Sequence, residues 1–141
     1  MHSEILRPMV VLIAWTLVML GWTLATRLPA MKAAGVDMRT LVGTKAADAD
    51  RALPPHIQWK AHNHNHLMEH PTLFYAVCAV LALSGTGNGV NAWIAWAYVG
   101  LRIAHSLVQA TSNRVRARFF FFMLSSLMLV ALTLHAALAV F

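Results

Sequence analysis

Four long apolar segments with almost no charged side chains constrain this sequence more than any other feature. They run over residues 6–28, 59–83, 91–111 and 117–141. A helix needs about 20 apolar residues to cross about 30 Å of hydrocarbon, and each segment is that long or nearly so. A helix also satisfies its own backbone hydrogen bonds in lipid. The sequence therefore predicts an all-α, integral membrane four-helix bundle that forms a single domain over residues 1–141, with residues 29–58 as one long loop.

The composition supports lipid as the surrounding medium. Charged residues make up 11% of the chain, whereas about a quarter would be usual in a water-soluble domain. The net charge of +6 would suggest nucleic acid only if a soluble domain carried a basic face. No such domain is evident, so we expect no nucleic-acid partner and interpret the positive charges as anchors at one membrane surface.

The positions of these positive charges predict the orientation of the chain. Loops rich in lysine and arginine remain on the cytoplasmic side of a membrane. The first and third connections carry nearly all of these residues, and the second carries none. We therefore expect a multi-pass protein of a bacterial inner membrane, with loop 29–58 in the cytoplasm and both termini on the opposite side. The residues that carry this prediction are Arg27, Lys32, Arg39, Lys45, Arg51, Lys60, Arg114, Arg116 and Arg118.

Two charged side chains lie well inside the apolar segments, away from their ends. Glu69 lies in the second segment and Arg102 in the third. A charge at membrane depth is costly and usually marks a function or a pairing. Because either group alone would stay unpaired, we predict a buried ion pair between them, either as a structural clamp or as part of a site.

Helical spacing extends these charges into two polar stripes, because residues three and four apart share a face. A polar stripe on an apolar helix must face protein or water, so we expect the two stripes to meet around a cavity that opens toward the basic side and favours an anion. The stripe on the second segment comprises His62, Asn65, His66 and Glu69, and that on the third comprises Arg102, His105, Ser106, Gln109 and Asn113.

Two further clusters allow more than one interpretation. His62, His66 and His70 are spaced as metal ligands could be, but no His-Glu-x-x-His motif occurs. We expect no metal site, since these imidazoles also suit the headgroup level of a membrane. The four phenylalanines at 119–122 are simply explained as interfacial anchors. Alternatively, they form a wall for a hydrophobic second substrate beside Arg118.

These residues resemble the MAPEG family, the membrane-associated proteins of eicosanoid and glutathione metabolism, in a bacterial-type member. The family's second helix carries Asn-x-x-Glu followed by proline and phenylalanine. Here that signature is His66-Leu-Met-Glu69 with Pro71 and Phe74. The third helix carries Arg-x-x-His-Ser, here Arg102-Ile-Ala-His105-Ser106. The resemblance covers most of the chain from Trp59 to Arg118.

The resemblance implies a homotrimer that binds glutathione, as co-substrate, between neighbouring subunits near the cytoplasmic surface. Glu69 would hold its amino group, and Arg118 would be the catalytic residue that stabilises the thiolate, since a guanidinium near sulfur favours that form. The sequence departs from the family at Gln109, Phe119 and Phe122, where some members carry hydroxyl residues, and at His66. The implied glutathione-binding residues are His62, Asn65, His66, Glu69, Arg102, His105, Gln109 and Arg114.

Two functional hypotheses follow. The first is a transferase or peroxidase that conjugates glutathione, or a similar anionic thiol, to a lipophilic electrophile from the bilayer or uses it to reduce that molecule. The second is a non-catalytic membrane bundle that binds lipid or a partner protein and uses the polar stripes for assembly. Conjugation of a generic aryl halide by the purified protein would distinguish them.

Overall fold

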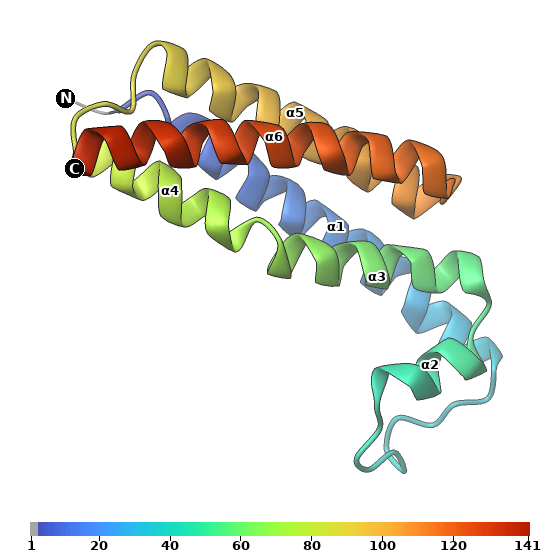
Figure 1. Ribbon diagram of the computed structural model, residues 1–141. Helices are drawn as coiled ribbons and strands as arrows, with labels where there is room; N and C mark the ends of the chain where they lie inside the picture. The colour runs from blue at the N-terminus through green and yellow to red at the C-terminus, as the bar shows by residue number, and fades with distance from the viewer. Residues whose placement is uncertain (1–2) are drawn as a thin grey trace.

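The computed structural model describes residues 3–141, and the regular structure in that range is entirely helical. The long helices lie alongside one another, while α2 and its flanking loops stand apart at one end of the molecule (Figure 1). The helices are α1 (Leu6–Ala33), α2 (Ala46–Ala52), α3 (Pro55–Glu69), α4 (Thr72–Leu83), α5 (Val90–Thr111) and α6 (Val115–Val140).

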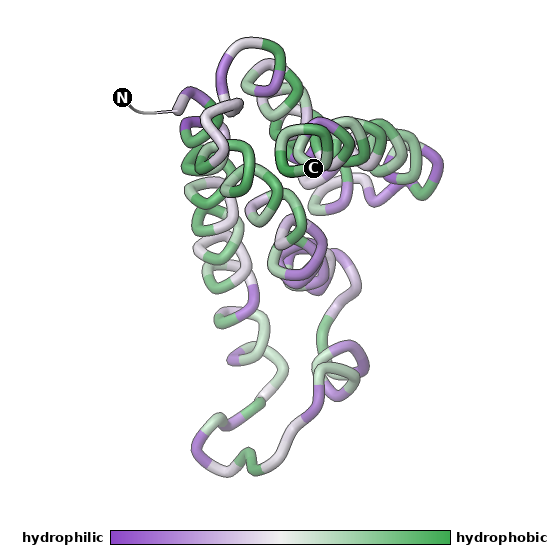
Figure 2. The backbone as a smooth tube through the Cα atoms, turned by 60° about the vertical axis from the view of Figure 1, so that its left-hand side comes forward, coloured by the Kyte–Doolittle hydropathy of each residue, from purple (hydrophilic) through white to green (hydrophobic). Residues whose placement is uncertain are grey.

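Three helical segments are long and apolar enough to cross a membrane: α1, the α3–α4 pair over Pro55–Leu83, and α6. The exposed side chains of α1, α4 and α6 are largely apolar, including Leu17, Leu127 and Leu134, as expected for surfaces that face lipid. Hydrophilic residues gather on α3 and in the loops beyond it (Figure 2). The fold is therefore that of a membrane-embedded all-α protein whose polar residues concentrate in one part of the molecule.

The apolar core lies where α1, α4, α5 and α6 meet. Phe74 of α4 stacks on Tyr98 of α5 with ring centroids 4.2 Å apart, and both side chains are fully buried. Leu12 of α1, Leu81 of α4 and Leu132 of α6 complete this core. Packing of this kind drives the association of helices in lipid, where water supplies no hydrophobic force between them.

The helix boundaries differ from the predicted ones at three places. α1 continues through Pro29 to Ala33 instead of ending near residue 28, and residues 29–58, predicted as a loop, contain α2 and the start of α3. The second apolar segment is two helices, because the chain bends at His70 and Pro71 between α3 and α4. Proline lacks a backbone N–H and its ring crowds the preceding turn, which accounts for the bend.

The N-terminal segment is fastened to the turn between α4 and α5, an arrangement that we call the N-terminal clasp (residues 4–5 with 87–89). The N–H of Ile5 donates to the carbonyl of Gly87 at 2.9 Å, and the N–H of Glu4 donates to Oδ1 of Asn88 at 2.8 Å. In return, the N–H of Gly89 donates to Oε2 of Glu4 at 3.1 Å. A Cβ atom at Gly87 would lie 2.7 Å from Cγ2 of Ile5 and 3.2 Å from the Cα of Ala82, so a larger residue there would force the clasp apart.

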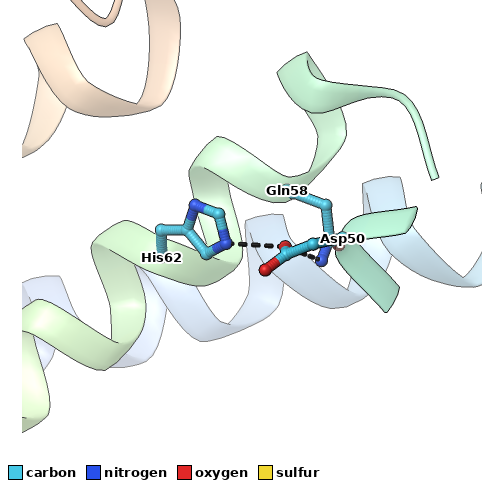
Figure 3. A network of polar contacts seen from close by, with 3 residues as sticks. All are labelled: Asp50, Gln58 and His62. Carbon is cyan, nitrogen blue, oxygen red and sulfur yellow. Dashed lines mark hydrogen bonds and ion pairs between the residues drawn. The ribbon is translucent and has the colours of Figure 1, made fainter. Parts of the chain in front are cut away.

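At the opposite end, Asp50 fastens α2 to α3 (Figure 3). Oδ1 of Asp50 accepts a hydrogen bond from Nε2 of Gln58 at 2.9 Å and lies 2.8 Å from Nε2 of His62. The hydrogen bonds from Gln58 and then from His62 lower the pKa of Asp50 from its usual value of 3.8. A carboxylate whose pKa is lowered by folding stabilises the folded state above its unfolded pKa.

Acid is therefore expected to release α2 from α3. The stabilisation that Asp50 gives to the contact between α2 and α3 should be fully present above about pH 4. It should be lost as the pH falls through the lowered folded-state pKa of Asp50. Hydrogen exchange of the α2 amides, corrected for the intrinsic pH dependence, should report this loss of protection. The Asp50→Asn variant should be less protected and should lack this pH dependence. An identical acid response in both proteins would contradict the assignment to Asp50.

Candidate functional site

A cavity of about 230 Å³ opens near the end of the molecule where α5 joins α6. Polar and aromatic side chains from α3, α5 and α6 meet there, and we call it the Arg118 cavity. Its volume is below the range of about 300 to 1,000 Å³ typical of sites for small organic ligands. By this scale, the cavity alone has room for only part of a small organic ligand. The lining residues are His66, His105, Gln109, Val115, Arg118, Phe119 and Phe122.

Arg102 lies behind this cavity and is fully buried. Its Nη2 is 2.9 Å from Nδ1 of His66. Glu69 is exposed, and no ion pair between Glu69 and Arg102 occurs within residues 3–141. The predicted ion pair was therefore wrong. α3 ends at Glu69, immediately before the bend, and the imidazole one turn earlier reaches the guanidinium instead.

Several buried polar atoms around the cavity lack a hydrogen-bond partner among the described residues. They include two hydrogen-bond acceptors, Oε1 of Gln109 and Nδ1 of His105 in the tautomer that carries its proton on Nε2. They also include donors, namely Nε of Arg118 and both Nε and Nη1 of Arg102. Buried polar groups are nearly always hydrogen-bonded, so a cluster of unpaired ones indicates a place where a polar ligand or water fits.

The turn that joins α5 to α6 orients Arg118. Asn113 adopts a left-handed backbone conformation (φ 49°), which asparagine tolerates better than most residues. Its Oδ1 accepts a hydrogen bond from Nη1 of Arg118. The guanidinium is thereby held at the first turn of α6, with its Nε left for another partner.

Beside the cavity, the hydroxyl of Ser106 connects three helices by hydrogen bonds. Oγ of Ser106 on α5 accepts hydrogen bonds from Nε1 of Trp15 on α1 at 2.9 Å and from Nδ2 of Asn63 on α3 at 2.6 Å. Asn63 and Ser106 are fully buried. We call these residues the Ser106 node. It sets the positions of α1, α3 and α5 immediately beside Arg102 and His105.

The structure brings together only some of the predicted site residues. His66, His105, Gln109 and Arg118 line the cavity, with Arg102 behind them. Phe119 and Phe122, two of the four phenylalanines at 119–122, also line it. The remaining predicted residues are exposed on this chain and lie outside the cavity lining: His62, Asn65, Glu69 and Arg114.

Sequence reasoning missed Asn63 and Trp15. The apolar residues Leu67, Phe74 and Leu81 recur every seven positions and are buried. Asn63 lies four residues before Leu67, one helical turn back, and therefore on the same face. This register, rather than the alternating histidines and asparagines, identifies the buried side of α3. Nothing comparable marks Trp15, which lies in a uniformly apolar segment.

Comparison with known protein families identifies the family of this chain. The family model described as the MAPEG family matches residues 5–138, which is nearly the whole sequence. The match includes every residue that lines the Arg118 cavity and all three residues of the Ser106 node. Searches of curated proteins and of solved structures gave no match. On the strength of the family model, this membrane-embedded helical protein belongs to the MAPEG family.

Proposed function

We propose that the protein is a glutathione-dependent membrane transferase whose Arg118 cavity holds the thiol end of glutathione. The cluster of unpaired buried polar atoms around Arg118 carries this proposal. Glutathione offers carboxylates and an ionisable thiol as partners for the unpaired guanidinium donors. Two guanidiniums, those of Arg102 and Arg118, meet no carboxylate partner within residues 3–141. Such a positive site favours a thiolate over a thiol.

The cavity volume supports a site shared between subunits of a homotrimer. The 230 Å³ in one protomer leave no room for a whole tripeptide by the usual scale of ligand sites. The exposed Glu69 and Asn65 remain available to the same ligand from a neighbouring protomer. In this arrangement, Glu69 would meet the ammonium group, and Phe119 and Phe122 would contact the lipophilic electrophile.

The membrane arrangement that accompanies this function has four crossings. α5 has 22 residues and is therefore roughly 33 Å long, enough to span the hydrocarbon. Its polar stripe is buried against neighbouring helices, so its outer face remains apolar. With the basic connections in the cytoplasm, both termini lie on the other side. A reporter fused after Phe141 that is active only in the cytoplasm would contradict this topology.

Glutathione binding is expected to give measurable heat in detergent, and S-methylglutathione should bind more weakly because it cannot form a thiolate. The purified protein should also conjugate glutathione to a generic aryl halide. Absence of both heat and conjugation would exclude the transferase proposal.

A non-catalytic bundle is the second candidate, because the cavity lining carries no hydroxyl side chain among the described residues. Glutathione binding without conjugation to any of a panel of electrophiles would favour it.

A further inference from the structure

The two ring nitrogens of His66 have different surroundings. Nδ1 lies 2.9 Å from Nη2 of Arg102. A guanidinium has donors only, so Nδ1 must be the acceptor and the single ring proton must sit on Nε2. No hydrogen bond among residues 3–141 uses Nε2 of His66, although the side chain lines the Arg118 cavity. The buried arginine therefore prepares an N–H donor at the cavity wall.

The orientation of this imidazole is fixed from several sides. Its ring stacks on those of His70 and His105, with centroids 5.7 and 5.1 Å away, and contacts Phe122 at 6.1 Å. Arg102, which sets the tautomer, is itself fully buried and has little freedom to move. Fixed donors of this kind stabilise developing or established negative charge without reorganisation.

The groups that face His66 also favour one protonation state. They are His70 from its own helix, Arg102 and His105 from α5, and Arg118 from α6. All are neutral or cationic. A second proton on the His66 ring would point Nδ1–H at the Arg102 guanidinium, which has no lone pair to accept it. His66 therefore acts as a neutral donor.

We propose that His66 donates a hydrogen bond from Nε2 to the thiolate sulfur of glutathione, and that Arg102 is the positioning residue that fixes the required tautomer. This inference rests on the proposed function. In the reaction, the S–H bond breaks and the proton passes to water. The sulfur lone pair then forms a bond to carbon of an electrophile such as an aryl halide, and the halide leaves with its bonding electrons. His66 keeps its proton throughout.

His66 supplies a neutral donor whose orientation is fixed, in a cavity that has no hydroxyl side chain among the described residues. The positions Gln109, Phe119 and Phe122 carry none. His105 is less suited, because its Nδ1 has no partner to select a tautomer and only 4% of the residue is exposed. Arg118 and His66 together then give the sulfur one charged and one neutral donor.

The test compares two substitutions of His66 that differ in which ring nitrogen they replace. Asparagine can still accept from Arg102 near the position of Nδ1 but has no donor at the position of Nε2, whereas glutamine can place an amide N–H there. His66→Asn should bind glutathione more weakly at a pH at which the bound thiol of the wild type is ionised, because it lacks the hydrogen bond that stabilises the thiolate. At saturating glutathione, the pH at which half of the bound thiol is ionised should be roughly one to two units higher than in wild type. The ultraviolet absorbance of the thiolate measures this ionisation. His66→Gln should restore part of this shift.

A matched control and a second measurement complete the experiment. His70→Asn removes a stacked imidazole that does not line the cavity and leaves the donor of His66 in place, so its ionisation profile should shift far less than that of His66→Asn. Nitrogen-15 NMR of histidine-labelled protein should show the Nε2–H tautomer for His66. In Arg102→Lys, whose shorter reach releases Nδ1, the two tautomers should mix and the thiol should again ionise at higher pH.

The outcomes separate the two proposals. If wild-type protein binds no glutathione, the proposed function fails and this inference fails with it. If glutathione binds and His66→Asn leaves the ionisation profile unchanged, the inference alone is overturned. A proton on Nδ1 of His66 in the wild-type NMR spectrum would overturn it as well, whether or not any variant folds.

Discussion

Replacing Arg118 by alanine is expected to lower kcat/KM for glutathione conjugation by roughly 10- to 150-fold. This range corresponds to the loss of one hydrogen bond to a charged group, worth about 1.5 to 3 kcal/mol. The guanidinium is placed at the first turn of α6 by its bond to Asn113, and its Nε has no other partner among the described residues. Removal should therefore cost thiolate stabilisation more than it costs folding. Steady-state kinetics with an aryl halide measure the effect.

Arg116→Ala is the matched control for this substitution. It removes the same charge from the same turn of α6, but Arg116 is exposed and does not line the cavity. Its kinetics should stay within about twofold of wild type, because exposed charges act weakly through solvent. Equal losses in the two variants would indicate a general effect of positive charge and would contradict a specific role for Arg118.

Replacing Ser106 by alanine is expected to lower the free energy of unfolding by roughly 2 kcal/mol. The change leaves the Trp15 and Asn63 donors without their shared acceptor, and Asn63 is completely buried. Each orphaned donor costs about 1 to 3 kcal/mol in general, although hydrogen bonds between membrane helices often contribute less. Reversible unfolding in mixed detergent micelles measures the change.

Ser125→Ala provides the comparison. Ser125 is also a fully buried helical serine, but within residues 3–141 its hydroxyl donates only to the carbonyl of Phe122 in its own helix. Its removal strands no donor on another helix and should have a clearly smaller effect. If the two serine variants lowered the free energy of unfolding equally, the hydrogen bonds of the Ser106 node would not stabilise the packing of the three helices.

The helices could be predicted from sequence because lipid restricts the alternatives. Apolar length alone located the segments that became α1, the α3–α4 pair and α6, and these are the three that satisfy the criteria for crossing a membrane. The ends were harder to predict. Pro29 usually suggests a helix terminus, yet α1 continues past it for a further turn. α2 is held by tertiary contacts of Asp50 that no local pattern reveals.

The site could be predicted on α5 but only partly on α3. On α5 the polar residues Arg102, His105 and Gln109 stand out against an apolar background, and all are buried as expected. On α3 polar residues occupy several faces, so their spacing alone did not reveal which face is buried. The carboxylate of Glu69 was the obvious partner for Arg102 by charge. Geometry instead gave that position to His66, because α3 bends immediately after Glu69.

The N-terminal clasp implies that the two ends of the protein differ in mobility. At the clasp, three hydrogen bonds and a close-packed glycine tie α1 to the turn between α4 and α5. At the other end, α2 is tied to α3 through an exposed carboxylate. Local opening is easiest where buried contacts are few. Slow local opening should therefore concentrate at the end that holds α2 and the cavity, while the clasped end stays rigid.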